Sequence, residues 1–481
     1  MASNTGKLYL AVAEGIARSI RSGVLPRGER IPSVRALAAQ QGVSVSTAIQ
    51  AYRALEDARL IEARPRSGYF VAARPAPLPE PETTQPPAAS QPVQPSALAA
   101  RVMQLASDAR YVSFGAACPG PELFDQDRIR RAISRAALRH RDQLARYAFG
   151  SGQEALRRAI ARHALAMGCR LDPARIVVAN GCRDALVLGL RAVTRPGDVV
   201  ALESPTYFGL LEILRHLGLR ALEIPTHPRH GLSLDALQFA LGTQPVKAVL
   251  AVPTLSNPIG ACMPVAERRR LARLLAEHDV PLLEDVIYND LCEQPEFRRA
   301  VKSFDASGHV MLCGSFSKTL APGMTLGWIE PGRWHAQVAG LKAATSGSQT
   351  AVLELAMADL LAQPGNESNY RQLRAAFARQ VDEGRQLVGA HFPRGTRVTD
   401  PPGGYILWLE LPEGADSQAL FEACLAEHIV IAPGGMFSSS DRYRRCIRLG
   451  VASTWGEAQR RALRRVGELA GRLQRQARQA A

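Results

Sequence analysis

The stretch Gly314–Gly323, GSFSKTLAPG, places a lysine between hydroxyl-bearing residues and a Pro-Gly turn. Lysine is scarce in this chain, since five of its 59 basic residues are lysines and the others are arginines. An arginine guanidinium stays protonated, whereas a lysine amine can lose its proton and attack a carbonyl to form a Schiff base. Lys318 is therefore a candidate for that chemistry, although a lysine in a serine-rich turn is also common on protein surfaces.

The residues before Lys318 favour the functional interpretation. His309–Cys313, HVMLC, is a short apolar run that predicts a buried strand. Lys318 would then stand just beyond the C-terminal end of this strand, which is the edge where open α/β sheets bind ligands.

Length and composition narrow the class of protein. A chain of 481 residues with 46% hydrophobic content can form two or three domains. We expect a cytoplasmic protein, because no apolar run approaches the roughly 18 residues of a membrane span and the N-terminus lacks a signal-peptide pattern. The eight cysteines show no C-x-x-C or C-x-x-H pairing, which predicts reduced thiols and no metal site.

A proline-rich segment predicts the main domain boundary. Pro75–Pro95 has eight prolines in 21 residues and almost nothing to bury, which is typical of an extended, solvated tether. We therefore predict a domain at 1–73, a linker at 74–103 and a larger domain at 104–481. The net charge is +15, and Met1–Arg74 holds eleven Lys and Arg against five Asp and Glu. This excess indicates nucleic acid as a partner, with solubility as the alternative.

The small domain has the pattern of a winged helix-turn-helix. Leu8–Arg21 shows helical apolar spacing, and Ser33 is placed to cap a second helix over Val34–Gln40. Ser44 or Ser46 opens a third helix that runs to about Ala58. Two short strands flank the basic loop 64–68 and predict a wing. A three-helix bundle without a DNA role has the same periodicity, but the basic wing favours DNA binding.

The stretch 31–71, IPSVRALAAQQGVSVSTAIQAYRALEDARLIEARPRSGYFV, resembles the winged helix of the GntR superfamily of bacterial regulators. The resemblance implies an α+β winged helix-turn-helix that contacts phosphates or base edges in the major groove and brings its wing toward the minor groove. The residues implied are Ser33, Arg35, Ser44, Ser46 and Thr47 for the helices, with Arg64 and Gly68 for the wing. Val45 departs from many relatives, in which an arginine is frequent.

In the larger domain, several predicted strands end in polar residues. A strand over Arg175–Ala179 leads through a turn at Asn180–Asp184 into a helix, and such a turn exposes N–H groups to an anion. The next strands lead to Tyr207, to Asn257, and to Asp285 with Tyr288. Each residue alone is a weak signal. Their joint occurrence before Lys318 favours a site for an aromatic, electron-withdrawing cofactor.

Residues from about Phe114 to Gly450 resemble the fold-type I aminotransferases that bind pyridoxal 5'-phosphate (PLP). The resemblance implies an α/β fold with a mostly parallel central sheet and a smaller α/β subdomain formed by segments that flank a large subdomain at about 145–330. It implies that Lys318 forms the internal aldimine, that Asp285 pairs with the pyridinium nitrogen and that Arg448 grips a substrate carboxylate.

The same resemblance implies further cofactor contacts. Asn257 and Tyr288 hold the ring phenolate oxygen, and Tyr207 stacks on the ring. The phosphate is bound by Gly181, Cys182, Arg183, Ser315 and Ser317, with Tyr147 reaching it from the neighbouring subunit. Thr325 departs from the pattern, because relatives usually have a phosphate-binding arginine seven residues after the lysine.

The order of winged helix, proline-rich segment and aminotransferase body resembles the MocR-type regulators. This resemblance implies a homodimer that binds operator DNA and senses a small amino compound through aldimine exchange. An aminotransferase enzyme with a DNA-binding appendage needs the same residues and remains an alternative. A PLP-free binding module is a third interpretation, favoured by Thr325 alone.

Overall fold

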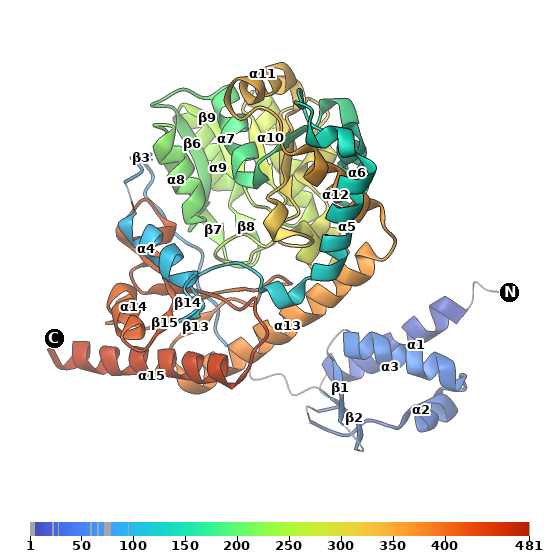
Figure 1. Ribbon diagram of the computed structural model, residues 1–481. Helices are drawn as coiled ribbons and strands as arrows, with labels where there is room; N and C mark the ends of the chain where they lie inside the picture. Colours follow the sequence, from blue (N-terminus) through green and yellow to red (C-terminus); the bar gives the residue numbers. More distant parts are fainter. Residues whose placement is uncertain are drawn as a thin grey trace. The chain divides into compact units, whose positions relative to one another are not determined.

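The computed structural model describes residues 5–21, 24–26, 28–57, 60–64, 67–71, 78–94 and 96–480. The chain divides into two units, Met1–Leu78 and Pro79–Ala481, and many of the elements of both are labelled in Figure 1. Each unit has its own hydrophobic core. None of the described helices is long and apolar enough to cross a membrane.

The first unit contains three helices and a two-stranded wing. Its elements are α1 (Thr5–Arg21), α2 (Val34–Gln41), α3 (Val45–Asp57), β1 (Ile61–Arg64) and β2 (Gly68–Val71). β1 and β2 pair antiparallel. Ser33 Oγ accepts a hydrogen bond from Ala36 N at 3.2 Å, so α2 begins where the sequence places its cap. Gly42 ends α2 in the left-handed conformation at φ 61°. The predicted winged helix-turn-helix is confirmed.

The second unit is built on a nine-stranded sheet in which the strand order is β3-β7-β6-β9-β10-β11-β12-β5, with β8 paired to β7. The strands are β3 (Gln91–Pro92), β5 (Val177–Ala179), β6 (Val199–Ser204), β7 (Arg220–His227), β8 (Gly231–Leu232), β9 (Val246–Ala251), β10 (Leu282–Asp285), β11 (Val310–Ser315) and β12 (Gly327–Glu330). β7, β6, β9, β10 and β11 pair in parallel, whereas β12 is antiparallel to both neighbours. The predicted mostly parallel sheet is confirmed.

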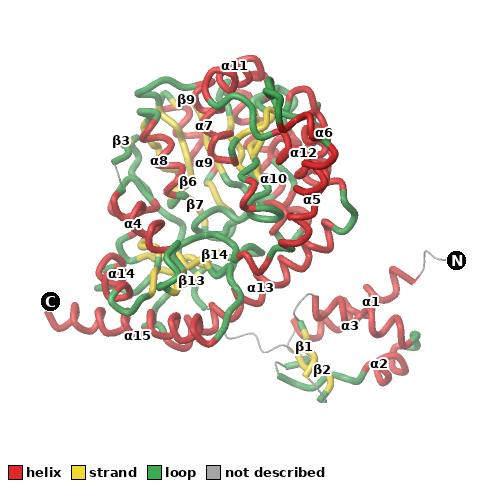
Figure 2. Tube along the Cα trace, viewed as in Figure 1, coloured by secondary structure: helices red, strands yellow, loops and turns green. Residues whose placement is uncertain are grey.

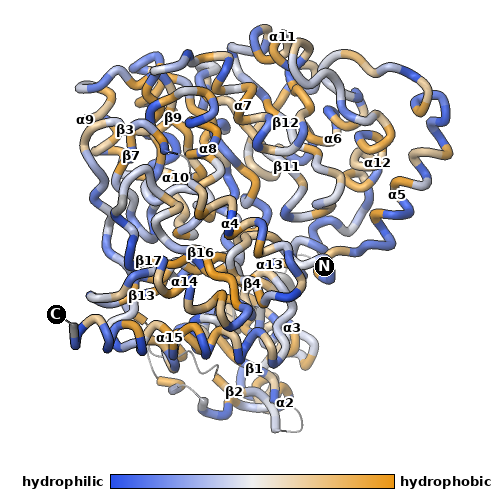
Figure 3. The backbone as a smooth tube through the Cα atoms, turned by 60° about the vertical axis from the view of Figure 1, so that its left-hand side comes forward, coloured by the Kyte–Doolittle hydropathy of each residue, from blue (hydrophilic) through white to orange (hydrophobic). Residues whose placement is uncertain are grey.

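Helices cover both faces of this sheet, as the red and yellow tubes of Figure 2 show. Val310 and Leu312 of β11 point to one face and pack in cores with α5 (Gln126–Arg139), α6 (Glu154–Ala164), α9 (Leu234–Thr243), α10 (Val265–Glu277) and α12 (Ala351–Ala362). Met311 points to the other face and lies against Gly189 of α7 (Gly181–Val193). The remaining helices of this part are α8 (Phe208–His216) and α11 (His335–Thr345). The strands carry mainly hydrophobic residues in Figure 3, as expected for strands buried on both faces.

The C-terminal part of the chain builds a smaller sheet. Its antiparallel strands, in spatial order, are β13 (Arg397–Val398), β14 (Ile406–Glu410), β17 (Cys446–Gly450) and β16 (Ala432–Pro433). The short strand β4 (Val112–Ser113) pairs in parallel with β15 (Ile429–Val430). The accompanying helices are α4 (Ala97–Ala106), α13 (Asn366–His391), α14 (Ser417–Leu425) and α15 (Glu457–Ala480).

The proline-rich segment differs from the solvated tether that the sequence predicts. Residues 79–94 form no helix, but they lie along the second unit, where β3 pairs with β7 and forms the edge of the sheet. Thr84 Oγ1 donates to Ser204 O at 2.6 Å and accepts from Thr226 N at 2.8 Å. Glu80 forms an ion pair with Arg229 at 2.5 Å. The prediction is wrong here because an extended chain, even when rich in proline, retains backbone and polar groups that can bind a sheet edge. Residues 72–77 lie outside the described residues.

Candidate functional site

Five side chains that the sequence singles out lie at the carboxyl edge of the parallel strands. Asp285 is the last residue of β10, and Tyr288 follows it after two residues. Lys318 comes three residues after β11, Tyr207 three residues after β6, and Asn257 six residues after β9. Because these strands are parallel neighbours, the residues that follow them meet at one edge of the sheet.

Lys318 is anchored to a segment about 200 residues earlier in the chain. Its Nζ donates to Ala117 O at 3.0 Å and lies 3.8 Å from Cys118 Sγ. Tyr405 OH also donates to Ala117 O, at 3.1 Å. The turn itself is held by Ser315, whose Oγ lies 2.8 Å from Ser317 Oγ and 3.0 Å from Leu326 O. The lysine amine therefore occupies a defined position.

Asp285 is a buried carboxyl beside this lysine. It is 8% exposed, and its Oδ1 accepts from Ile287 N at 2.9 Å and from the Cys182 thiol at 3.2 Å. Burial raises the pKa of Asp285 to about 6, while the two hydrogen bonds and the charge of Lys318 act in the opposite direction. A cation placed next to this carboxyl would favour its ionised form.

Asn257, Tyr288 and Arg448 form a connected polar group. Asn257 Nδ2 donates to Tyr288 OH at 3.3 Å, and Arg448 Nη1 donates to Asn257 Oδ1 at 3.3 Å. Arg448 also donates to Gly115 O, two residues from the carbonyl that binds Lys318. Burial raises the pKa of Tyr288 and lowers that of Arg448. The site thus joins the lysine and the arginine through one short segment, Gly115–Ala117.

Arg448 is a buried cation without a counterion in the described part of the chain. It is 1% exposed, its Nε has no hydrogen-bond partner, and no carboxylate of a described residue lies within 4.0 Å of it. Its guanidinium carbon lies 5.0 Å from the centre of the Phe437 ring. A buried unpaired charge is costly, so this arrangement favours an anionic ligand.

The opposite end of the site is the turn at the start of α7. Gly181 has φ 75°, and Asn180 makes no side-chain cap, which leaves the first N–H groups of α7 available to an anion. Arg183 is exposed. The Cys182 thiol points to Asp285, so its backbone N–H is the group that can face a phosphate. Thr325 lies against the same turn, since its Cγ2 is 3.8 Å from the position a Cβ on Gly181 would take.

Two predicted tyrosines differ in their surroundings. Tyr207 is half-buried and in edge contact with Phe208, with ring centroids 4.6 Å apart. Burial raises its pKa, and the charges of Arg183 and Arg448, one from each end of the site, act in the opposite direction. Tyr147 is 89% exposed and stacks on Phe149, which is 87% exposed. Its predicted role in a neighbouring subunit remains a prediction.

The predicted DNA-binding residues divide into exposed and internal ones. Arg35 and Ser46 are exposed. Ser44 Oγ accepts from Thr47 N at 3.1 Å and lies 2.8 Å from Thr47 Oγ1. Thr47 is 3% exposed, so the structure places it inside the unit, where it supports the start of α3. Ser33 caps α2.

In the wing, Arg64 forms an ion pair with Glu62 at 2.7 Å and stacks on Phe70 at 4.3 Å. Gly68, with φ 97°, begins β2. Of the three residues between them, 65 and 66 are outside the described part of the chain, so the basic tip itself remains a prediction.

Sequence reasoning missed the segment Gly115–Ala117, which supplies carbonyl oxygens to Arg448 and Lys318. It also missed two buried hydroxyls that have no partner in the described residues, Thr206 Oγ1 and Ser256 Oγ. Thr206 and Ser256 directly precede Tyr207 and Asn257 in the sequence, so their positions beside predicted site residues could have indicated a role in the site. Residues 115–118 are small and follow no predicted strand of the large domain, so nothing in the sequence indicated their role.

Comparison with known proteins identifies the family. Residues 8–71 match the gntR family of bacterial regulatory proteins, and residues 120–466 match the aminotransferase class I and II family. The uncharacterized HTH-type transcriptional regulator YjiR of Escherichia coli (strain K12) is 36% identical over 96% of this chain and 98% of its own length. The probable rhizopine catabolism regulatory protein MocR of Rhizobium meliloti is 26% identical over 89% of this chain and 86% of its own length. This chain belongs to the MocR-type transcriptional regulators.

A solved structure supports the fold of this MocR-type regulator. LysN, an α-aminoadipate aminotransferase from Thermus thermophilus, was crystallised with N-(5'-phosphopyridoxyl)-L-leucine. It superimposes with a TM-score of 0.70 at 25% identity and covers 81% of this chain and 97% of its own. The regulator thus joins a GntR DNA-binding domain to a fold-type I aminotransferase domain, whose family is PLP-dependent.

The residues present fit PLP. Asp285 is a buried carboxyl whose ionised form needs a cation, and Lys318 supplies the amine beside it. The unpaired hydroxyls of Thr206 and Ser256 and the uncapped start of α7 provide polar groups that described residues do not satisfy.

Proposed function

We propose that this regulator binds PLP at Lys318 and senses an amino acid or a related amine through aldimine exchange. Binding of the amine then changes how a homodimer, acting in the cytoplasm, engages operator DNA. The observation that carries the proposal is the buried guanidinium of Arg448, which no described carboxylate neutralises. It shares the Gly115–Ala117 segment with Lys318, so an α-carboxylate and an amine of one small molecule can be recognised together.

Each predicted residue has a role in this proposal. Bound PLP supplies an electron sink, and the protein orients it and sets its protonation. Asp285 pairs with the ring nitrogen, Asn257 and Tyr288 hold the ring oxygen, and Tyr207 stacks on the ring. The phosphate lies at the start of α7, bound by Gly181, Cys182, Arg183, Ser315 and Ser317.

The homodimer is part of the same proposal. Tyr147 and Phe149 are almost fully exposed and stack on each other, which is unusual for a pair of aromatic side chains on a free surface. A second copy would cover them, and Tyr147 would then reach the partner's phosphate. Two linked winged helices would bind paired DNA sites far more tightly than one does.

A spectroscopic titration tests the sensing site. The holoprotein should absorb visible light, and amino acids should change that spectrum at lower concentration than the matched amines that lack the α-carboxylate. The same amino acid should change the affinity for DNA fragments that the purified protein retains. Equal responses to an amino acid and to its decarboxylated amine would contradict the role of Arg448.

Transamination is a second candidate function, and Asp285 favours it. Exchange of one amine for another does not need an ionised partner at the ring nitrogen, whereas removal of the Cα proton does. Steady-state assays with pairs of amino acids and 2-oxo acids distinguish the two functions. Sustained turnover would show an enzyme, and a spectral change without turnover would show a sensor.

The DNA-binding role can be tested at one exposed arginine. Arg35 is at the second position of α2 and is exposed, so Arg35→Ala removes a charge without disturbing the core. We expect weaker binding at all sequences and a salt dependence reduced by about one ion if Arg35 contacts phosphate. If it reads a base edge, the loss should be confined to one position of the operator. Unchanged operator affinity in the full-length variant would count against this interface.

A further inference from the structure

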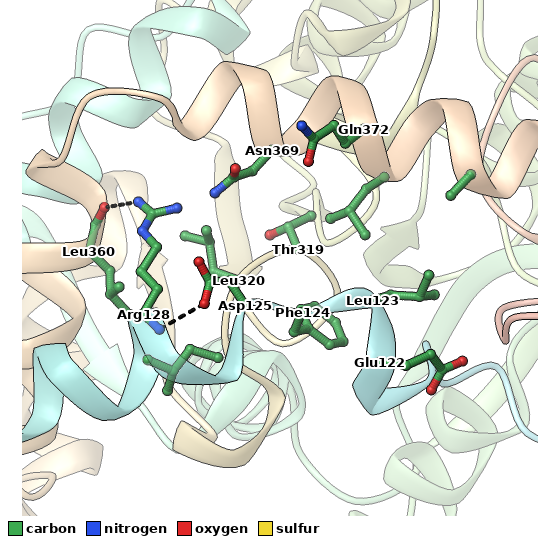
Figure 4. A pocket seen from close by; sticks show the side chains of 13 residues that line it. Glu122, Leu123, Phe124, Asp125, Arg128, Thr319, Leu320, Leu360, Asn369 and Gln372 are labelled. Carbon is green, nitrogen blue, oxygen red and sulfur yellow. Dashed lines mark hydrogen bonds between the residues drawn. The ribbon is translucent and has the colours of Figure 1, made fainter.

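A cavity of about 240 Å³ lies in the second unit behind the turn that carries Lys318 (Figure 4). Thr319 and Leu320, which follow Lys318 in sequence, form one wall. The short 3-10 helix η1 (Pro121–Leu123) and the start of α5 form a second wall, and α13 forms a third. The lining includes none of the residues assigned to PLP or to the effector. This space is therefore separate from the site proposed above.

Thr319 places a buried hydroxyl without a partner beside this cavity. It is 3% exposed, and its Oγ1 has no hydrogen-bond partner among the described residues. Figure 4 shows Thr319 across the cavity from α13, with its oxygen turned toward the side on which Leu320 and Arg128 lie. A buried hydroxyl without a partner costs free energy, so a ligand that accepts or donates a hydrogen bond here would be favoured.

The other polar lining groups include two side-chain amides and one guanidinium. Asn369 and Gln372 reach in from α13, and no hydrogen bond of their side chains to a described residue is present. Arg128 donates through Nε to Gln363 at 3.0 Å and through Nη2 to Asn366 at 2.6 Å. Both acceptors are neutral amide oxygens, and no described carboxylate lies within 4.0 Å of this guanidinium. The positive charge of Arg128 is therefore not neutralised by an ion pair.

Two acidic side chains also line the cavity, and both have their own partners. Asp125 Oδ1 accepts from Arg128 N at 2.8 Å and caps α5. Glu122 Oε1 accepts from Thr454 N at 2.7 Å, and Figure 4 shows it at the far end, beyond Leu123. The rest of the lining is apolar and consists of Leu123, Phe124, Ile129, Leu320, Leu360, Leu373 and Ala376.

We propose that this cavity binds a small monocarboxylate with a short apolar body. Its carboxylate accepts hydrogen bonds from Thr319 and from the amide groups of Asn369 and Gln372, in the field of Arg128. Its body lies on the apolar wall. The volume equals that of about eight water molecules, which suits an acid of roughly six carbons. The ligand would contact Thr319, which is next to Lys318 in sequence. Its binding could therefore change the position of the turn that carries Lys318.

Ligand-observed NMR on the full-length protein tests this proposal, with 4-methylpentanoate as the probe and 4-methylpentanamide as its neutral control. The experiment uses the Arg448→Ala background, which removes the guanidinium that the proposed function assigns to a carboxylate. We expect a dissociation constant in roughly the millimolar range for the acid. Thr319→Val should weaken binding by about fivefold or more, whereas Thr319→Ser should retain it.

A second variant distinguishes loss of the binding site from loss of the folded state in Thr319→Val. Ala376 is half-buried and lines the cavity, so Ala376→Phe should fill the space and abolish binding while thermal stability is kept. Absence of binding to the Arg448→Ala protein, equal binding by the Thr319→Val variant, or equal affinity for the amide would each overturn the proposal. The visible PLP spectrum does not enter these readouts, so the proposed function stands or falls separately.

Discussion

The two ends of the proposed PLP and effector site are built differently. At the carboxylate end, Arg448 is 1% exposed and fixed by Gly115 O and Asn257. At the phosphate end, Arg183 is exposed and Thr325 stands where the resemblance to fold-type I aminotransferases implies an arginine. One end is a preorganised buried charge, and the other depends on backbone N–H groups and hydroxyls. Changes at the carboxylate end should therefore have larger effects than changes at the phosphate end.

The largest effect on stability is expected at Asp285, which lies between the two ends. Its pKa in the cofactor-free protein is raised from 3.8 to about 6, so the folded state holds this proton more tightly than the unfolded state does. The free energy of unfolding should therefore fall by at most about 3 kcal/mol as the pH rises from about 4 to about 6. Above that range the contribution of Asp285 stays constant.

Asp285→Asn should remove this loss. In the cofactor-free protein, the urea midpoint of the variant should exceed that of wild type at pH 8 and approach it near pH 4. PLP should reverse the order at pH 8, because its ring nitrogen gives the carboxylate a partner. Burial raises the pKa of Glu203 to about 8, and the charge of Asp285 adds a smaller increase, so Asp285→Asn should also lower the pKa of Glu203 slightly. A difference that does not vary with pH would contradict the assignment.

The next effect is expected at the carboxylate end. A charge-assisted pair in a partly dehydrated pocket contributes about 1.5–3 kcal/mol, so Arg448→Ala should weaken an amino acid effector by roughly ten- to a hundredfold. The visible PLP spectrum should remain, and affinity for the decarboxylated amine should change little. Arg183→Ala is the matched variant at the other end. Loss of PLP from Arg448→Ala on dialysis would place this arginine at the cofactor instead of the effector.

The smallest effect is expected at the phosphate end. Thr325→Arg introduces a charge beside the Gly181 turn and should slow PLP release by roughly three- to tenfold, because an arginine binds phosphate in bidentate fashion. Dialysis of wild type and variant measures this. No change in the release rate would mean that Arg183 already neutralises the phosphate. In that case Arg183→Ala should release PLP faster, and the contrast between the two ends would be weaker than proposed.

The parts of the site that could be predicted from the sequence are those that follow a strand. Asp285, Asn257 and Lys318 come after apolar runs, and parallel strands bring such residues to one edge. Gly115–Ala117 could not be predicted in this way, since Ala117 lies 201 residues before Lys318 and has no side chain that indicates binding. Its contribution comes from carbonyl groups, which every residue carries.

Two other differences have local physical causes. Thr47 has the position of a DNA contact in the sequence pattern, but α3 turns it inward, toward Ser44. The proline-rich segment has the composition of a tether, yet Thr84 satisfies polar groups at the end of β6 and in β7. The composition of a segment indicates how much apolar surface the segment itself can bury. It does not indicate whether the segment pairs with the edge of a sheet formed by another part of the chain.

Borohydride reduction followed by peptide mapping tests the central claim most directly, because it locates the lysine that carries PLP. The holoprotein is reduced, digested and analysed by mass spectrometry, with Lys318→Ala and the exposed-lysine variant Lys247→Ala treated alike. The account predicts a phosphopyridoxyl group on Lys318 in wild type and in Lys247→Ala, and none in Lys318→Ala. A phosphopyridoxyl group on any of the other four lysines, or its persistence in Lys318→Ala, would contradict the account.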